Sequence, residues 1–162
     1  MAFCKKLGIN ARKLFALGWR DLVLLAEAWI LLAWVDLLIS GLPYKYWSYW
    51  LQEPVGAVPE PGPVDRHREQ NVSRVIQLSE AAARNHLRPM NCLRRCFVQQ
   101  RLLKRRDVAS DLHIGVRKTA GGLEAHAWLS SQGRVLNDTP DVSQRYAQLQ
   151  TAQWANISRF VA

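Results

Sequence analysis

The sequence has few cysteines, and they do not form a paired set. Cys4, Cys92 and Cys96 are an odd number, whereas a small secreted domain normally carries an even one. Charged residues between positions 12 and 21 interrupt the apolar stretch that a signal peptide would need. We therefore expect reduced thiols and a cytoplasmic protein.

Acidic residues are scarce in one segment of the chain. Residues 66–106 contain eleven Lys and Arg against two acidic residues, so this segment alone accounts for the net charge of +9. A basic patch of this size suggests nucleic acid. Its cations are spread along predicted helices, however, without interleaved aromatic residues or a nucleic-acid-binding motif. We expect a solvated basic helix face, with an acidic peptide or protein as the alternative partner, and no nucleic acid.

A long apolar run free of charge is also missing. The apolar stretch 22–42 contains Glu27 and Asp36, and an aspartate at the centre of a bilayer costs about 2.5–3.5 kcal/mol. Residues 10–40 are therefore predicted to form a helix that is buried or lies at an interface. Five of the seven tryptophans fall in the first fifty residues. The aromatic stretch 44–50 suits either a bilayer surface or a lid of core aromatics, so residues 20–50 are a candidate peripheral membrane contact.

Proline marks a boundary in the first half of the chain. Four prolines within residues 53–65 exclude a helix or a central strand and predict an extended linker. The linker separates an N-terminal apolar and aromatic helical element, residues 1–52, from a core at residues 66–150. A C-terminal tail, residues 151–162, follows the core.

The hydrophobic period changes within the core. Apolar spacing predicts a helix over 66–87, ended by Pro89, and a second helix that begins near Cys92 with Asn91 as its N-cap. The later segments predict three strands and a short helix, at 112–116, 124–130, 134–138 and 142–149. Helices followed by an antiparallel meander predict an α+β fold with the helices packed on the sheet.

Cys92 is the candidate nucleophile. At the first turn of a helix, unpaired N–H groups and the helix dipole favour a thiolate, which is the reactive form of cysteine. Cys96, one turn further along, is interpreted as a buried structural cysteine. His126, flanked by two alanines, is the candidate base.

The hairpin after His126 supplies a third candidate. Ser131-Gln132-Gly133 matches a three-residue loop with glycine in third place. This loop would set Trp128 opposite Leu136 and His126 opposite Asp138, so the carboxylate would orient the imidazole as in a catalytic triad. Asn137, the alternative orienting residue, would point to the opposite face.

The remaining histidines, His67, His86 and His113, are interpreted as surface or packing residues. A zinc site formed by Cys92, Cys96, His113 and His126 is an alternative, but the C-x3-C spacing is not typical of zinc ligands. We expect neither a metal nor a cofactor.

The order Cys, His, Asp on a helix followed by strands resembles the transglutaminase-core form of the papain-like arrangement. The matching runs are Cys92-Leu93-Arg94-Arg95-Cys96, Leu102–Arg106, Ile114–Arg117, Ala125-His126-Ala127-Trp128 and Gly133–Asp138. Over roughly residues 66–140 they resemble the lasso-peptide leader peptidases, the maturation B proteins. The chain departs from that pattern at Cys96, where serine is common, and at Asp107, where glycine is usual.

The resemblance implies a cysteine peptidase that cuts a ribosomally made precursor between leader and core, with Cys92, His126 and Asp138 as its triad. It also implies a separate winged-helix-like protein that recognises the leader, and an ATP-using macrolactam cyclase as a further partner. Two alternatives remain at this stage. One is acyl transfer to an amine, as in a transglutaminase or amidase, and the other is an inactive membrane-associated binding scaffold.

Overall fold

The structure is a computed structural model that describes residues 17–43, 46 and 66–149. Three helices form its first layers: α3 (Trp19–Gly41), α5 (Arg66–Arg84) and α6 (Cys92–Lys104). A four-stranded antiparallel sheet follows, made of β1 (Asp111–Thr119), β2 (Gly122–Ser131), β3 (Arg134–Val135) and β4 (Ala147–Gln148), with the short helix α7 (Val142–Arg145) before the last strand. This is the α+β fold, with helices on an antiparallel sheet, that the sequence predicts.

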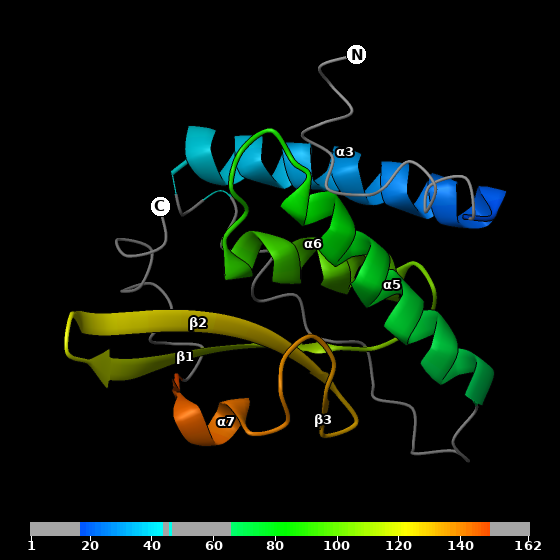
Figure 1. The fold of residues 1–162 in the computed structure, drawn as a ribbon. Coiled ribbons are helices and arrows are strands. Elements are labelled where there is room, and N and C mark those ends of the chain that lie inside the picture. The colour runs from blue at the N-terminus through cyan, green and yellow to red at the C-terminus, as the bar shows by residue number, and fades with distance from the viewer. Residues whose placement is uncertain (1–16, 44–45, 47–65, 150–162) are drawn as a thin grey trace.

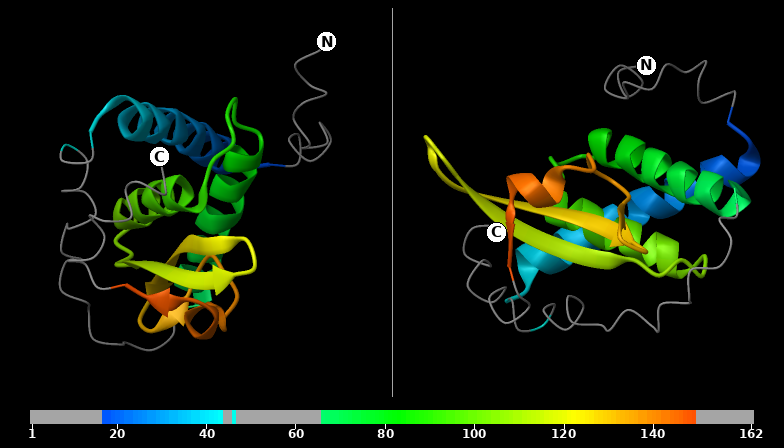
Figure 2. Two further views of the ribbon diagram at one scale, coloured as in Figure 1. Left: turned by 90° about the vertical axis from the view of Figure 1, so that its left-hand side faces the viewer. Right: turned by 90° about the horizontal axis from the view of Figure 1, so that it is seen from below.

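The elements are stacked in layers. α6 packs against both α3 and β2, so it lies between the N-terminal helix and the sheet, while α7 lies on the opposite face of the sheet (Figures 1 and 2). The strand order is β3-β2-β1-β4. One apolar cluster joins the three helices to the sheet, and a smaller one (Trp128, Val142 and Tyr146) lies under α7.

The predicted helix at 10–40 is observed from Trp19 onward, and residues 10–16 lie outside the described part. α3 is long and apolar enough to cross a membrane. Its inner side, however, is buried against α5 and α6 through Leu24, Ala28, Leu32 and Val35, among others. The linker predicted at 53–65 and the tail at 151–162 fall outside the described residues.

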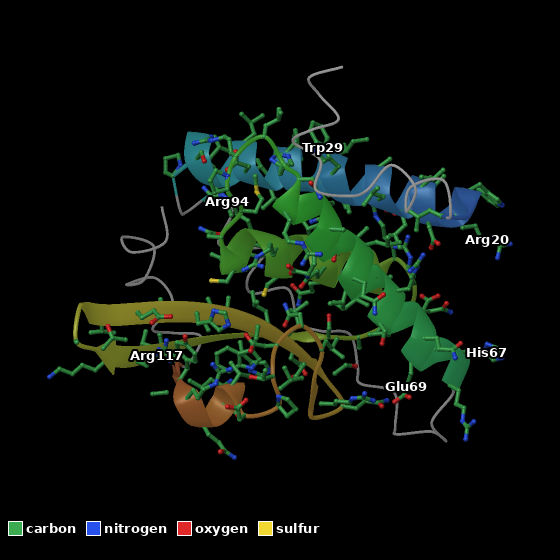
Figure 3. The ribbon with its side chains drawn as sticks, in the orientation of Figure 1. Arg20, Trp29, His67, Glu69, Arg94 and Arg117 are labelled. Carbon is green, nitrogen blue, oxygen red and sulfur yellow. The ribbon has the colours of Figure 1, made fainter. Side chains whose placement is uncertain are left out.

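The acidic residues of α3 point inward and meet arginines of α5, of α6 and of the segments that follow these two helices. Asp36 forms an ion pair with Arg94 of α6 at 2.9 Å, and both side chains are nearly buried, with exposed fractions of 9% and 11% (Figure 3). Arg88 adds a second ion pair to Asp36 at 3.1 Å. The carboxylates that interrupt the apolar run of α3 therefore fix how this helix packs on the rest of the fold.

The ends of the helices follow local chemistry. The Asn91 side chain accepts a hydrogen bond from the backbone N–H of Arg94 at 3.0 Å, which confirms the predicted N-cap of α6. After α6, Asp107 has a φ of 56°, in the left-handed region that favours glycine. This positive φ explains why glycine is usual at this position in the family that the sequence resembles.

The hairpin between β2 and β3 differs from the prediction. Its loop has two residues, Gln132 and Gly133, with φ values of 51° and 75° as in a type I′ turn. Ser131 therefore pairs with Arg134 and Ser130 with Val135, one residue out of the predicted register. The predicted strand 134–138 is also wrong in length, because β3 ends at Val135.

Candidate active site

Cys92 is the first residue of α6, where the helix presents its unpaired N–H groups to the thiol. Partial burial raises the pKa of this thiol. Hydrogen bonds to the His126 ring and to the backbone N–H groups of Ala127 and Leu93 lower it by more, so the pKa of Cys92 lies below its ordinary value. The site therefore favours the thiolate.

His126 lies in the middle of β2, opposite Gly115 of β1. Its Nε2 is 2.5 Å from Oδ2 of Asp138, and the same ring forms a hydrogen bond with the Cys92 thiol. The bond to Cys92 raises the pKa of His126, and the bond to Asp138 raises it further, although burial opposes both effects. The structure thus brings together the three residues that the sequence selected.

Asp138 reaches His126 because the chain leaves the ladder after Leu136. The observed register, if continued, would place Asp138 opposite Ala127 on the wrong face of the sheet. Instead, the backbone N–H of Leu136 donates to the Leu129 carbonyl at 2.9 Å, and the N–H of Leu129 donates to the side-chain Oδ1 of Asn137 at 2.8 Å. The side-chain oxygen of Asn137 thus replaces a backbone carbonyl as the hydrogen-bond acceptor for β2. Because the backbone has left the ladder here, Asp138 can turn toward His126.

The second oxygen of Asp138 is also held. Its Oδ1 accepts from the backbone N–H of Thr139 at 2.7 Å and from the Arg145 guanidinium at 3.1 Å. Burial raises the pKa of Asp138, but the hydrogen bonds from His126 and Thr139 lower it, and the net pKa lies below its usual value. Asp138 therefore stays ionised and keeps a fixed orientation. Sequence reasoning missed Arg145, which gives no local signal of its role.

Asn137 forms a polar network between the sheet and the helices. Its Nδ2 donates to Oε1 of Gln99 at 2.7 Å and to the Cys96 sulfur at 3.2 Å, and Nε2 of Gln99 donates to Glu80 at 2.8 Å. Gln99 is fully buried, so these bonds satisfy polar atoms that water does not reach. Cys96 is buried as predicted, and burial raises the pKa of its thiol, which leaves Cys92 as the more acidic of the two.

Tyr146 is a second residue that the sequence did not reveal. Its ring centroid is 5.0 Å from that of His126, and its hydroxyl donates to Glu124 at 2.8 Å. Trp128 lies on the same face of the sheet, with its ring centroid 6.3 Å from that of His126. Two aromatic rings therefore limit the orientations of the imidazole.

Because Gly115 has no side chain, Tyr146 and Trp128 can pack closely against its backbone. A Cβ at this position would lie 2.8 Å from Cβ of Tyr146 and 2.9 Å from the ring of Trp128. We expect Gly115→Ala to lower the free energy of unfolding by about 1–3 kcal/mol, the usual cost of overpacking. Urea denaturation measures this change. Gly121→Ala is the matched control, since its Cβ would meet nothing nearer than 4.0 Å, and equal losses in both variants would contradict the prediction.

The other histidines have structural partners. His113 is bonded through Nε2 to Ser130 at 2.7 Å and through Nδ1 to Gln148 at 2.6 Å, and His86 packs on Trp29 at 4.9 Å between ring centroids. Both nitrogens of His113 are thus engaged, and the alternative zinc site is not assembled. Within residues 17–43, 46 and 66–149, no group of three or more His, Cys, Asp or Glu side chains is placed to hold a metal ion.

Comparison with known proteins assigns the chain to a family. The model of the transglutaminase-like superfamily matches residues 42–151, about two thirds of the chain. The chain belongs to the transglutaminase-like superfamily. No curated protein and no solved structure gives a significant match. This transglutaminase-like domain is of the cysteine-peptidase and acyl-transferase type, and its matched segment contains Cys92, His126 and Asp138.

Proposed function

We propose that this transglutaminase-like protein is a cysteine peptidase that removes the leader from a ribosomally synthesised lasso-peptide precursor. The observation that carries the proposal is the position of the His126 ring, held between the Cys92 thiol and the Asp138 carboxylate. The similarity of its motifs to the lasso-peptide leader peptidases supports the choice of substrate.

The residues account for each proton in the reaction. His126 takes the thiol proton, and the Cys92 sulfur attacks the scissile carbonyl carbon. The imidazolium then gives its proton to the leaving amine of the core peptide as the peptide bond breaks, which leaves the leader on Cys92 as a thioester. Water attacks the thioester and His126 accepts a proton from that water. The C–S bond then breaks, the leader leaves as a carboxylic acid, and the proton on His126 returns to the Cys92 sulfur.

The surroundings support this chemistry. N–H groups at the start of α6 are suited to stabilising the negative charge that develops on the carbonyl oxygen. Asp138 keeps the imidazole in one orientation and stabilises its charged form. In our proposal a separate winged-helix-like protein supplies leader recognition, and a macrolactam cyclase uses the amine that cleavage exposes.

The test combines the purified chain with candidate precursors encoded beside it and their leader-recognition protein, and measures peptide masses. We expect leader and core fragments whose masses sum to that of the precursor plus one water. Cys92→Ala provides the control without a nucleophile. Cys96→Ser is the matched cysteine control, and it should retain cleavage because Cys96 is buried and its thiol takes no part in the proposed reaction.

Two results would overturn the proposal. Adding a labelled amine and recovering mainly an amine adduct of the leader would indicate acyl transfer to amines rather than hydrolysis. An intact precursor, together with a Cys92 thiol that reacts no faster with iodoacetamide than an ordinary cysteine, would indicate an inactive binding scaffold.

A further inference from the structure

The side of α3 that faces away from the fold is apolar along its length. Val23, Ile30, Trp34 and Leu37 project from this side, with exposed fractions of 57%, 63%, 51% and 65%. We call these residues, together with Leu22 and Ala26, the outer face of α3. Every charged side chain of α3 between Leu22 and Ser40, all of which the structure describes, lies off this face. A face this long and uncharged exceeds what scattered surface apolar residues explain.

Positive charge exceeds negative charge around α3. The three carboxylates of α3 (Asp21, Glu27 and Asp36) are paired with five arginines: Arg74, Arg88, Arg94, Arg105 and Arg106. The buried Asp36–Arg94 pair is neutral overall. The four other arginines have side chains that are 33–65% exposed, and they outnumber Asp21 and Glu27 by two. Arg20, at the start of the helix, adds another cation, which lies 5.5 Å from the ring of Trp19 (Figure 3).

The loop between α5 and α6 extends this surface. His86 packs on Trp29 of α3, and Arg88 pairs with Asp36, so the loop runs beside the helix (Figure 1). Leu87, between these two contacts, has an exposed fraction of 72%. The same edge of the molecule thus presents a further apolar side chain next to a cation.

We propose that the outer face of α3 docks on an anionic lipid surface. The outer face contains an exposed tryptophan, Trp34, and exposed arginines lie close to the helix. This is the composition of a helix that lies in the plane of a membrane interface. The excess of cations favours anionic headgroups. The helix lies on the bilayer and does not cross it, because its other side is packed on α5 and α6 through the buried Asp36–Arg94 pair. The proposal is independent of the substrate of the peptidase.

The test is sedimentation of the full chain with vesicles of equal parts phosphatidylcholine and phosphatidylglycerol. We expect the protein to sediment with these vesicles, to sediment much less with pure phosphatidylcholine, and to be released in part by salt, because screening weakens the attraction. Ile30→Glu should weaken vesicle binding by about tenfold or more, since it places a carboxylate in the contact.

Leu123→Glu is the matched control. Leu123 has an exposed fraction of 69% but lies on the sheet, away from α3, and its replacement should leave vesicle binding unchanged. If Ile30→Glu does not fold, Ile30→Ala replaces it in the test, and a smaller loss of vesicle binding is expected. Circular dichroism checks folding, and activity in lipid-free buffer should be the same in the wild type and in all of these variants.

Three outcomes would overturn the proposal. The wild type could fail to sediment with anionic vesicles, or Leu123→Glu could weaken binding as much as Ile30→Glu. In the third, light scattering would find a dimer that Ile30→Glu converts to a monomer while vesicle binding stays unchanged. The outer face would then be covered by a second copy of the chain.

Discussion

Replacing His126 with alanine is expected to lower the rate of peptide cleavage by at least about 10³-fold, within the range for loss of a triad base. The variant loses both the acceptor of the thiol proton and the group that lowers the pKa of Cys92. It should therefore also slow alkylation of Cys92 by iodoacetamide near neutral pH. Mass spectrometry of the tryptic peptides gives the alkylation rate at each cysteine, with Cys4 replaced by serine to remove its signal.

The pH dependence of alkylation separates this explanation from simple misfolding. In the wild type the pKa of Cys92 is lowered, so the thiolate persists to a lower pH than in an ordinary cysteine and is lost only as the pH falls through that lowered pKa. The pKa of His126 is raised, so the imidazolium is lost only as the pH rises through that raised pKa. Both shifts favour the thiolate–imidazolium pair relative to an isolated cysteine and histidine, and cleavage should decline on both the acidic and the basic side of its optimum.

In His126→Ala the alkylation profile of Cys92 should move toward higher pH, because burial of the thiol then acts with less opposition. Cys96 should remain unreactive in both proteins, since it is buried. An unchanged profile in the variant would show that His126 does not control the thiol, and would remove the basis for the proposed mechanism.

Replacing Asp36 with alanine is expected to lower the free energy of unfolding by roughly 3–5 kcal/mol. The change leaves Arg94, which is 11% exposed, without its carboxylate between α3 and α6. The Ser40 hydroxyl, 3.1 Å from Arg94, is not charged and compensates only in part. Urea denaturation followed by circular dichroism measures the loss.

A double variant tests whether the unpaired charge is the cause. Asp36→Leu with Arg94→Met removes both charges and fills the space with apolar groups, so most of the lost stability should return. Asp21→Ala is the matched control, because its partner Arg74 is 43% exposed and remains hydrated, and the expected cost is at most about 1 kcal/mol. Equal losses for Asp36→Ala and Asp21→Ala would contradict the argument.

Local sequence predicted the elements that hold the site. Asn91 and the apolar spacing after it predicted the start of α6 at Cys92, because capping and helix periodicity depend on neighbouring residues alone. The change to alternating residues predicted β1 and β2 for the same reason. Those two predictions place Cys92 at a helix start and His126 on a strand.

The hairpin shows where local reasoning fails. Glycine in third place led to the prediction of a three-residue loop. The structure instead has a two-residue turn in which Gln132 adopts a φ of 51°, a conformation that is unfavourable for glutamine by itself. The contact between His126 and Asp138 was predicted, but the pairing that was to produce it was wrong. It forms because Asn137 bonds to Gln99 and Leu129 and draws the chain out of the ladder.

The sequence by itself thus determined which residue types stand at a helix start and on a strand, since both depend on interactions within a few positions. Only the tertiary structure decided the orientation of Asp138, the ring of Tyr146 against His126, and the inward direction of Asp36. Those contacts join residues 12, 20 and 58 positions apart. They form only when the core has packed, because that packing brings distant residues into contact and leaves each buried polar group to find a partner.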